Sequence, residues 1–294
     1  MRWTMTLVLL TIPAFANAQD TFTLKMPPQA KGDVHRVSID MRDSTRVLRI
    51  DMFGNEFKRH ITSAASLLSY ADECLAVDNG TVTSFRRHIE SAAQIVNEGD
   101  PIFLAVHGKT VRVDQQNGTR QLTWEDAPAR PDTFTEQLEQ ELKDGKDKKA
   151  AIASFDPLPG QAVKVGESWN IDVSAIVKDC EAKHGCKLTG ATGTGTLKEV
   201  YQGAKGQCAK VEVHIKVPLT TLKAGETVIE LKDDSGTSLD GIYDFALTAG
   251  DSHYQSVMRL NFQAVGTTAE RDGTSARLQI ETAVELKEQR VGQR

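Results

Sequence analysis

The chain has 294 residues, a formal net charge of −5, and a charged fraction of 26%. A mild acidic excess spread along the chain disfavours nucleic-acid binding, because such proteins concentrate basic side chains on one face. Aromatic residues make up only 6% of the chain, which argues against the stacked aromatic platform of a carbohydrate-binding module. The length accommodates one large β domain or two smaller ones.

The N-terminal residues 1–18 have the features of a secretory signal peptide. Arg2 precedes the apolar run Met5–Ile12, and residues 16–18 form an A-x-A cleavage site, so we expect cleavage between Ala18 and Gln19. The apolar run is shorter than the roughly 20 residues that span a bilayer. No cysteine lies at the cut for lipid attachment, and no later stretch has the character of a transmembrane anchor. The sequence therefore predicts a soluble periplasmic or secreted protein.

Alternation of apolar and polar residues dominates the rest of the chain and predicts β-strands with one buried face. The clearest case is 211–217, where every odd-numbered residue is β-branched and every even-numbered residue is charged or histidine. Similar runs occur at 37–41, 46–52, 108–114, 227–231, 254–262 and 276–286. One-sided alternation is typical of antiparallel sheets.

Turn signals separate these runs. Asp78-Asn79-Gly80, Asn117-Gly118 and Asp272-Gly273 contain Asn-Gly or Asp-Gly, which tolerate the positive φ angles of tight hairpins. Hairpins in series make meanders. We therefore predict a mainly β fold whose antiparallel meanders form curved sheets or an open barrel.

One segment has helical periodicity instead. Thr133 and Glu136 have the T-x-x-E spacing of a capping box, and Phe134, Leu138 and Leu142 follow at four-residue spacing. This pattern predicts one amphipathic helix near 133–145, packed on a sheet face rather than serving as a lid.

The helix and the proline-containing linker before it divide the chain. We expect an N-terminal β segment at 19–126, a linker and helix at 127–155, and a C-terminal β segment at 156–290. The two β segments could also form one continuous domain.

Four cysteines, Cys74, Cys180, Cys186 and Cys208, form an even set in a chain that is expected to be exported, which favours disulfides. The short polar segment CEAKHGC could close as a loop through Cys180–Cys186, and Cys74–Cys208 would then join the two halves. Free thiols are the main alternative. A metal site using Cys180, His184 and Cys186 matches no standard zinc spacing.

Catalytic patterns are not recognisable in the sequence. No histidine pair has H-E-x-x-H spacing, the segment around Ser168 lacks the final glycine of a nucleophile elbow, and no glycine-rich phosphate loop occurs. We therefore assign no catalytic, cofactor-binding or metal residue and expect no cofactor.

The segment 158–169, LPGQAVKVGESW, is the most distinctive block. It predicts a turn, a short extended piece, a glycine bend and a strand whose Trp169 enters the core. The block resembles the motif LP-x(3)-VKVG-[ED]-[ST]-W of an uncharacterised family of exported bacterial proteins, of planctomycete and myxobacterial type. The resemblance extends as a pattern over about 30–290, including residues 76–87 and 108–111. Ala162 replaces a frequent proline, and the four cysteines are not part of the pattern. The family has no assigned activity, so the resemblance implies an exported β protein and no site residues.

Curved sheets often enclose an apolar cavity. The leading hypothesis is therefore a non-enzymatic exported protein that binds an apolar ligand, such as a lipid, or a cell-envelope component. One alternative is a structural or protein-interaction module with a filled core, and another is a hydrolase with dispersed carboxylates.

Overall fold

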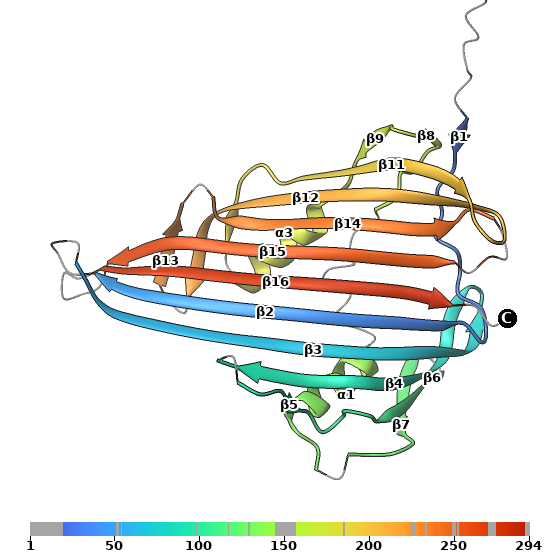
Figure 1. The fold of residues 1–294 in the computed structure, drawn as a ribbon, viewed down its shortest axis with the longest axis horizontal. Coiled ribbons are helices and arrows are strands. Elements are labelled where there is room, and N and C mark those ends of the chain that lie inside the picture. The colour runs from blue at the N-terminus through green and yellow to red at the C-terminus, as the bar shows by residue number, and fades with distance from the viewer. Residues whose placement is uncertain are drawn as a thin grey trace, which may run out of the picture.

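The structure, a computed structural model, describes residues 20–291 with gaps at 51–52, 54, 98, 117, 129, 145–156, 185, 225–226, 233, 249–250, 252 and 270–274. One antiparallel sheet of 14 strands dominates it (Figure 1). The prediction of a mainly β protein built from antiparallel meanders is confirmed.

The sheet consists of two meanders that run outward from a central pair of strands. β2 (Val34–Ile50) pairs along its whole length with β16 (Ser275–Val291), although the two strands lie at opposite ends of the sequence. Outward from β2 lie β3 (Glu56–Asp78), β4 (Thr81–Val96), β6 (Thr110–Gln116) and β7 (Thr119–Trp124). Outward from β16 lie β15 (Tyr254–Ala269), β14 (Gly236–Ala246), β12 (Gln207–Ala224), β11 (Thr192–Gln202) and β9 (Ser168–Asn170). Strands from both expected β segments thus share one sheet.

Shorter strands complete the sheet at its margins. β5 (Ile102–Phe103) pairs with β4, and β10 (Lys187–Leu188) pairs with β12. β13 (Thr227–Leu231) and β14 lie end to end between β12 and β15. Each of the two pairs with β12 on one side and with β15 on the other. A separate two-stranded sheet joins β1 (Thr21–Phe22) to β8 (Val163–Lys164).

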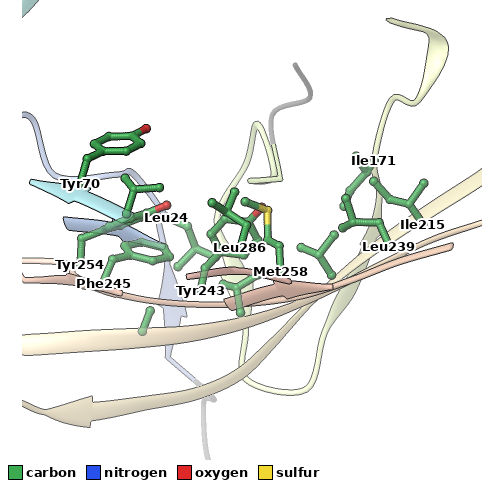
Figure 2. Close-up of a cluster of buried hydrophobic side chains, with 14 of the residues drawn as sticks. Leu24, Tyr70, Ile171, Ile215, Leu239, Tyr243, Phe245, Tyr254, Met258 and Leu286 are labelled. Atoms are coloured by element: carbon green, nitrogen blue, oxygen red, sulfur yellow. The ribbon is translucent and has the colours of Figure 1, made fainter. Parts of the chain in front are cut away.

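The buried side chains gather on one face of the large sheet, which we call the core face. It carries Val213, Met258, Leu286 and Tyr70, and the opposite face is called the outer face. In 211–217 the odd-numbered side chains are buried and the even-numbered ones are not, as the alternation predicts. Figure 2 shows how residues from several strands, together with Leu24 from the N-terminal segment, fill the space against this face.

The predicted helix is α1 (Thr133–Asp144), which packs against β7 and buries Leu138 and Leu142. Its cap differs from the prediction by one residue. The Oδ1 of Asp132 accepts hydrogen bonds from the Thr135 amide at 2.8 Å and the Thr135 hydroxyl at 2.7 Å. The capping residue is therefore Asp132 rather than Thr133. The Asp132 carboxylate also accepts a hydrogen bond from the Ala105 amide at 2.9 Å, which joins the helix to the preceding segment.

A second helix, α3 (Ser174–His184), was not predicted. The backbone around Cys180 is helical, so the expectation of a polar loop there is wrong. Asp172 begins it by accepting a hydrogen bond from the Ser174 amide at 2.9 Å. Ile176 packs against the core, which supplies the apolar contact that stabilises so short a helix. Both helices lie behind the sheet in Figure 1. Within the described ranges, no helix combines the length and apolarity needed to cross a membrane.

Two of the predicted turns are visible. Asn79 and Gly80 have φ angles of 48° and 78° and join β3 to β4. Gly118, with φ of 78°, lies between β6 and β7. The turn expected at Asp272-Gly273 falls outside the described residues.

The VKVGESW block is a tight turn between β8 and β9. Gly166 has φ of 85°, and the Glu167 amide donates to the Lys164 carbonyl at 3.0 Å, as in a type II turn. The Glu167 carboxylate in turn accepts from the Lys164 amide at 2.8 Å. Trp169 packs against the core, and its indole donates to the Pro157 carbonyl at 3.0 Å. The block thus forms the turn, the glycine bend and the strand that its sequence predicts.

Candidate functional site

A pocket with a volume of about 520 Å³ lies on the core face beside the β3–β4 turn, and we call it the end pocket. Its charged lining consists of Arg87, Arg120, Arg290, Asp72 and Glu288, with His35. Its apolar lining includes Met26, Val82, Phe85, Cys74 and the ring of Tyr254. The volume lies in the range of small-molecule pockets, which are typically about 300–1,000 Å³.

The register of the sheet places the charged residues side by side. Tyr254 pairs with Arg290, Arg290 with His35, His35 with Asp72, and Asp72 with Arg87. Directly opposed residues of antiparallel strands share a face, so these five form one row across β15, β16, β2, β3 and β4, here called the polar row.

Arg87 and Asp72 form the best-paired part of the polar row. The Nε and Nη2 atoms of Arg87 donate to the two carboxylate oxygens of Asp72, both at 2.7 Å. The Arg87 guanidinium also lies 3.8 Å from the centroid of the Tyr70 ring. Only 3% of the Arg87 side chain is exposed. A buried charge needs this forked pairing and stacking, since an unpaired one costs several kcal/mol.

Glu288 is the second carboxylate of the pocket and is 5% exposed. Its Oε2 accepts hydrogen bonds from the Tyr254 hydroxyl at 2.8 Å and the Ser256 hydroxyl at 3.2 Å. The Nε2 of His35 lies 4.0 Å from the same oxygen. Burial, with the charge of Glu288 added, raises the pKa of Tyr254, so its hydroxyl remains a neutral donor.

Arg290 differs from Arg87 because, among the described residues, no carboxylate forms a forked ion pair with its guanidinium. One terminal nitrogen donates to the Pro27 carbonyl at 2.6 Å, and the guanidinium lies 5.3 Å from the Tyr254 ring centroid. Its Nε is buried and has no hydrogen-bond partner in the described part of the chain. Burial lowers the pKa of Arg290, because a desolvated guanidinium is less stable in its charged form.

The N-terminal segment forms the other wall of the pocket. Leu24 is buried in the core, Met26 and Gln29 line the pocket, and Pro27 supplies the carbonyl that Arg290 contacts. β1 anchors the start of this segment to β8.

Chemically, this arrangement suits binding better than proton transfer. Both oxygens of Asp72 and one oxygen of Glu288 already accept hydrogen bonds from named partners. The pocket instead combines an apolar wall with a desolvated arginine.

A second hollow lies on the outer face across β15, β16, β2 and β3. It has a volume of about 710 Å³, and small residues such as Ala65 and Ala283 form part of its floor. Ion pairs including Arg42–Asp40 and Arg259–Glu285 flank it. These charges are exposed and mutually paired, which leaves the hollow without a recognisable anchor for a small ligand.

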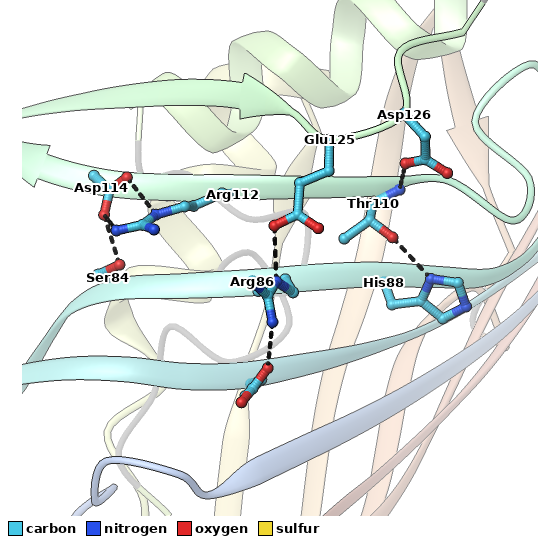
Figure 3. A network of polar contacts seen from close by, with 9 residues as sticks. Ser84, Arg86, His88, Thr110, Arg112, Asp114, Glu125 and Asp126 are labelled. Atoms are coloured by element: carbon cyan, nitrogen blue, oxygen red, sulfur yellow. Dashed lines mark hydrogen bonds and ion pairs between the residues drawn. The ribbon is translucent and has the colours of Figure 1, made fainter.

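The outer face of β4 and β6 carries a further polar network (Figure 3). Arg86 donates to Glu125 at 2.8 Å, and Asp114 accepts from Arg112 at 2.8 Å and from the Ser84 hydroxyl at 2.6 Å. Its members satisfy one another at the surface, so we treat the network as structural.

The cysteines do not form the predicted long-range bond. Cys74 on β3 and Cys208 on β12 are buried free thiols. Five strand-to-strand steps separate them in the sheet, about 24 Å at the usual spacing, whereas a disulfide needs Cα atoms within about 7 Å. The predicted Cys74–Cys208 disulfide is therefore wrong. The side chains of Cys180 and His184 lie outside the described residues, so the Cys180–Cys186 bond stays a prediction, as does cleavage between Ala18 and Gln19.

Sequence reasoning missed the polar row, although its signal was present. Asp72 has the same alternation parity as the buried Tyr70, His35 has that of Val37, and Arg290 has that of Leu286. In each case a charged residue or a histidine stands at a position where the alternation predicts a buried apolar side chain. Which strands would bring these residues together was not readable from the sequence.

Comparisons with known proteins add little to this geometry. No protein-family model matches the chain, and no curated protein matches it. A solved structure described as showing lipid–protein interactions in lipovitellin is similar over 87% of this chain, with 11% identity and a TM-score of 0.38. The present chain spans 25% of that one. At this TM-score the similarity carries no argument about function.

Proposed function

We propose that the protein is an exported, non-enzymatic binding protein that takes a ligand with an apolar part in the end pocket. The observation that carries this proposal is a pocket of about 520 Å³ with an apolar wall formed by Met26, Val82 and Phe85. The signal-peptide features of residues 1–18 support export to the periplasm or the medium.

The filled core alters where a ligand would bind. Side chains occupy the space behind the sheet, so the proposed ligand lies at one end of the core face rather than inside a barrel. Burial of the ligand's apolar part then supplies the affinity, at about 25 cal/mol for each Å² removed from water.

The test uses the full chain exported to a bacterial periplasm. Native mass spectrometry checks for a co-purifying lipid, and calorimetry measures binding of 1-dodecanol, an uncharged apolar probe. We expect the Val82→Trp variant, which places an indole in the end pocket, to weaken dodecanol binding at least tenfold. The matched control is Ile242→Trp, at a position 44% exposed and outside the pocket, which should bind as the wild type does. Repeated ligand-free spectra with no dodecanol binding would exclude this function.

One observation favours a second candidate, a protein-interaction module. The hollow of about 710 Å³ on the outer face is lined by residues of five long strands, β15, β16, β2, β3 and β4. An Ala283→Arg substitution would fill it. If an envelope protein is captured by the wild type and lost in this variant, with dodecanol binding absent in both, the interaction role is the better description.

A further inference from the structure

The end pocket carries a feature that an uncharged apolar ligand does not explain. Burying an arginine without a carboxylate is costly, because the guanidinium loses its hydration. Arg87 meets that cost through Asp72. Arg290 meets it only in part, through one carbonyl and the face of an aromatic ring.

The carboxylates around the pocket already have other partners. Asp72 is committed to Arg87, and one oxygen of Glu288 accepts from the hydroxyls of Tyr254 and Ser256. Asp33 adds a negative charge near Arg290, and its carboxylate accepts from the Ala30 amide at 2.8 Å.

The Nε edge of the Arg290 guanidinium indicates which chemical group of a ligand could bind there. The Pro27 carbonyl takes one terminal nitrogen, which leaves the buried Nε as a donor. A guanidinium edge holds a planar carboxylate through two parallel hydrogen bonds, a geometry that a hydroxyl or an ester cannot reproduce.

We propose that the end pocket binds a long-chain carboxylic acid, with its carboxylate on the Nε edge of Arg290 and its hydrocarbon chain against Met26, Val82 and Phe85. This inference rests on the proposed function and names the ligand class for the same pocket. Arg120, which also lines the pocket, adds positive charge at its margin.

The test compares three probes of equal chain length by calorimetry: dodecanoic acid, 1-dodecanol and methyl dodecanoate. We expect wild-type protein to bind the acid about tenfold to a hundredfold more tightly than the other two, the range for a hydrogen bond to a charged group. Arg290→Gln should remove this preference while leaving the affinity for dodecanol within about twofold. The control Arg259→Gln changes an arginine on the outer face, 67% exposed, and should keep the preference.

The outcomes distinguish the two proposals. Equal binding of all three probes overturns the carboxylate inference and leaves the apolar-ligand function standing. Binding of none of them by the wild type overturns both. If Arg290→Gln does not fold, Arg290→Lys keeps the charge but loses the forked geometry. An unchanged acid preference in that variant would contradict the role of the Nε edge.

Discussion

Gly195 shows how a single missing side chain shapes the fold. It lies on β11 directly opposite Trp169 on β9, and a Cβ atom built there would overlap the indole ring. The absence of a side chain is therefore what lets Trp169 lie flat on the sheet and reach the Pro157 carbonyl.

We predict that Gly195→Ala lowers the free energy of unfolding by about 1–3 kcal/mol, the usual cost of forcing extra volume into a packed site. The rigid indole cannot move aside without losing its hydrogen bond. Gly160→Ala is the matched control, because a Cβ at that position meets nothing within 4 Å. Urea denaturation of both variants checks this, and equal stability of the two would contradict the packing argument.

Asp132 acts as an N-cap and also ties α1 to the Ala105 amide. We predict that Asp132→Ala lowers the free energy of unfolding at neutral pH by about 1–2 kcal/mol, since the cap is lost. Asp132→Asn retains a capping oxygen and should lose less.

The pH dependence of the same site has a definite sign. Burial on its own would raise the pKa of Asp132, but the hydrogen bonds from Ala105 and Thr135 outweigh it and lower the pKa below its ordinary 3.8. The stabilisation from the ionised carboxylate is thus present above about pH 4 and is lost as the pH falls through the folded-state pKa. Denaturation curves should show the gap between wild type and Asp132→Ala narrowing in acid. A gap that stays constant would contradict the assignment.

At the scale of elements, alternation and turn signals were enough to predict most strands, the β3–β4 hairpin and α1. They were not enough for α3, because its short apolar stripe becomes significant only when Ile176 meets the core. Nor could they place the polar row. The β2–β16 pairing joins residues more than two hundred positions apart, and local patterns contain no information about such a register.

The α3 region carries a testable redox expectation. Cys74 and Cys208 are free, while Cys180 and Cys186 flank the end of the helix. If the predicted Cys180–Cys186 bond forms, protein isolated oxidised and unfolded in concentrated guanidinium should show two thiols. Cys74→Ser should reduce the count to one, whereas four thiols in the wild type would contradict the Cys180–Cys186 bond. In the native protein both free thiols should react slowly, because burial raises the pKa of Cys74 and of Cys208.

At the scale of the whole molecule, the sheet depends on tyrosines buried on β14 and β15. Burial raises the pKa of Tyr243 and of Tyr254, and Glu288 raises both further. Tyr243 donates to the Met258 sulfur at 3.0 Å, and Tyr254 donates to Glu288 at 2.8 Å. The folded state therefore needs both hydroxyls neutral.

This requirement predicts how stability changes in alkali. An unfolded tyrosine titrates near pH 10, so the stabilisation from each neutral hydroxyl is complete below about that pH. Above it, the unfolded chain loses a proton that the folded chain keeps, and each such group lowers the free energy of unfolding by up to about 1.4 kcal/mol per pH unit. Tyr254→Phe removes one of the two groups. Urea denaturation at increasing pH should then show a shallower decline for the variant than for the wild type, although the variant is less stable at neutral pH. Lysines titrate alike in both proteins, so the difference in slope isolates Tyr254, and identical slopes would mean that its hydroxyl is not held neutral by the fold.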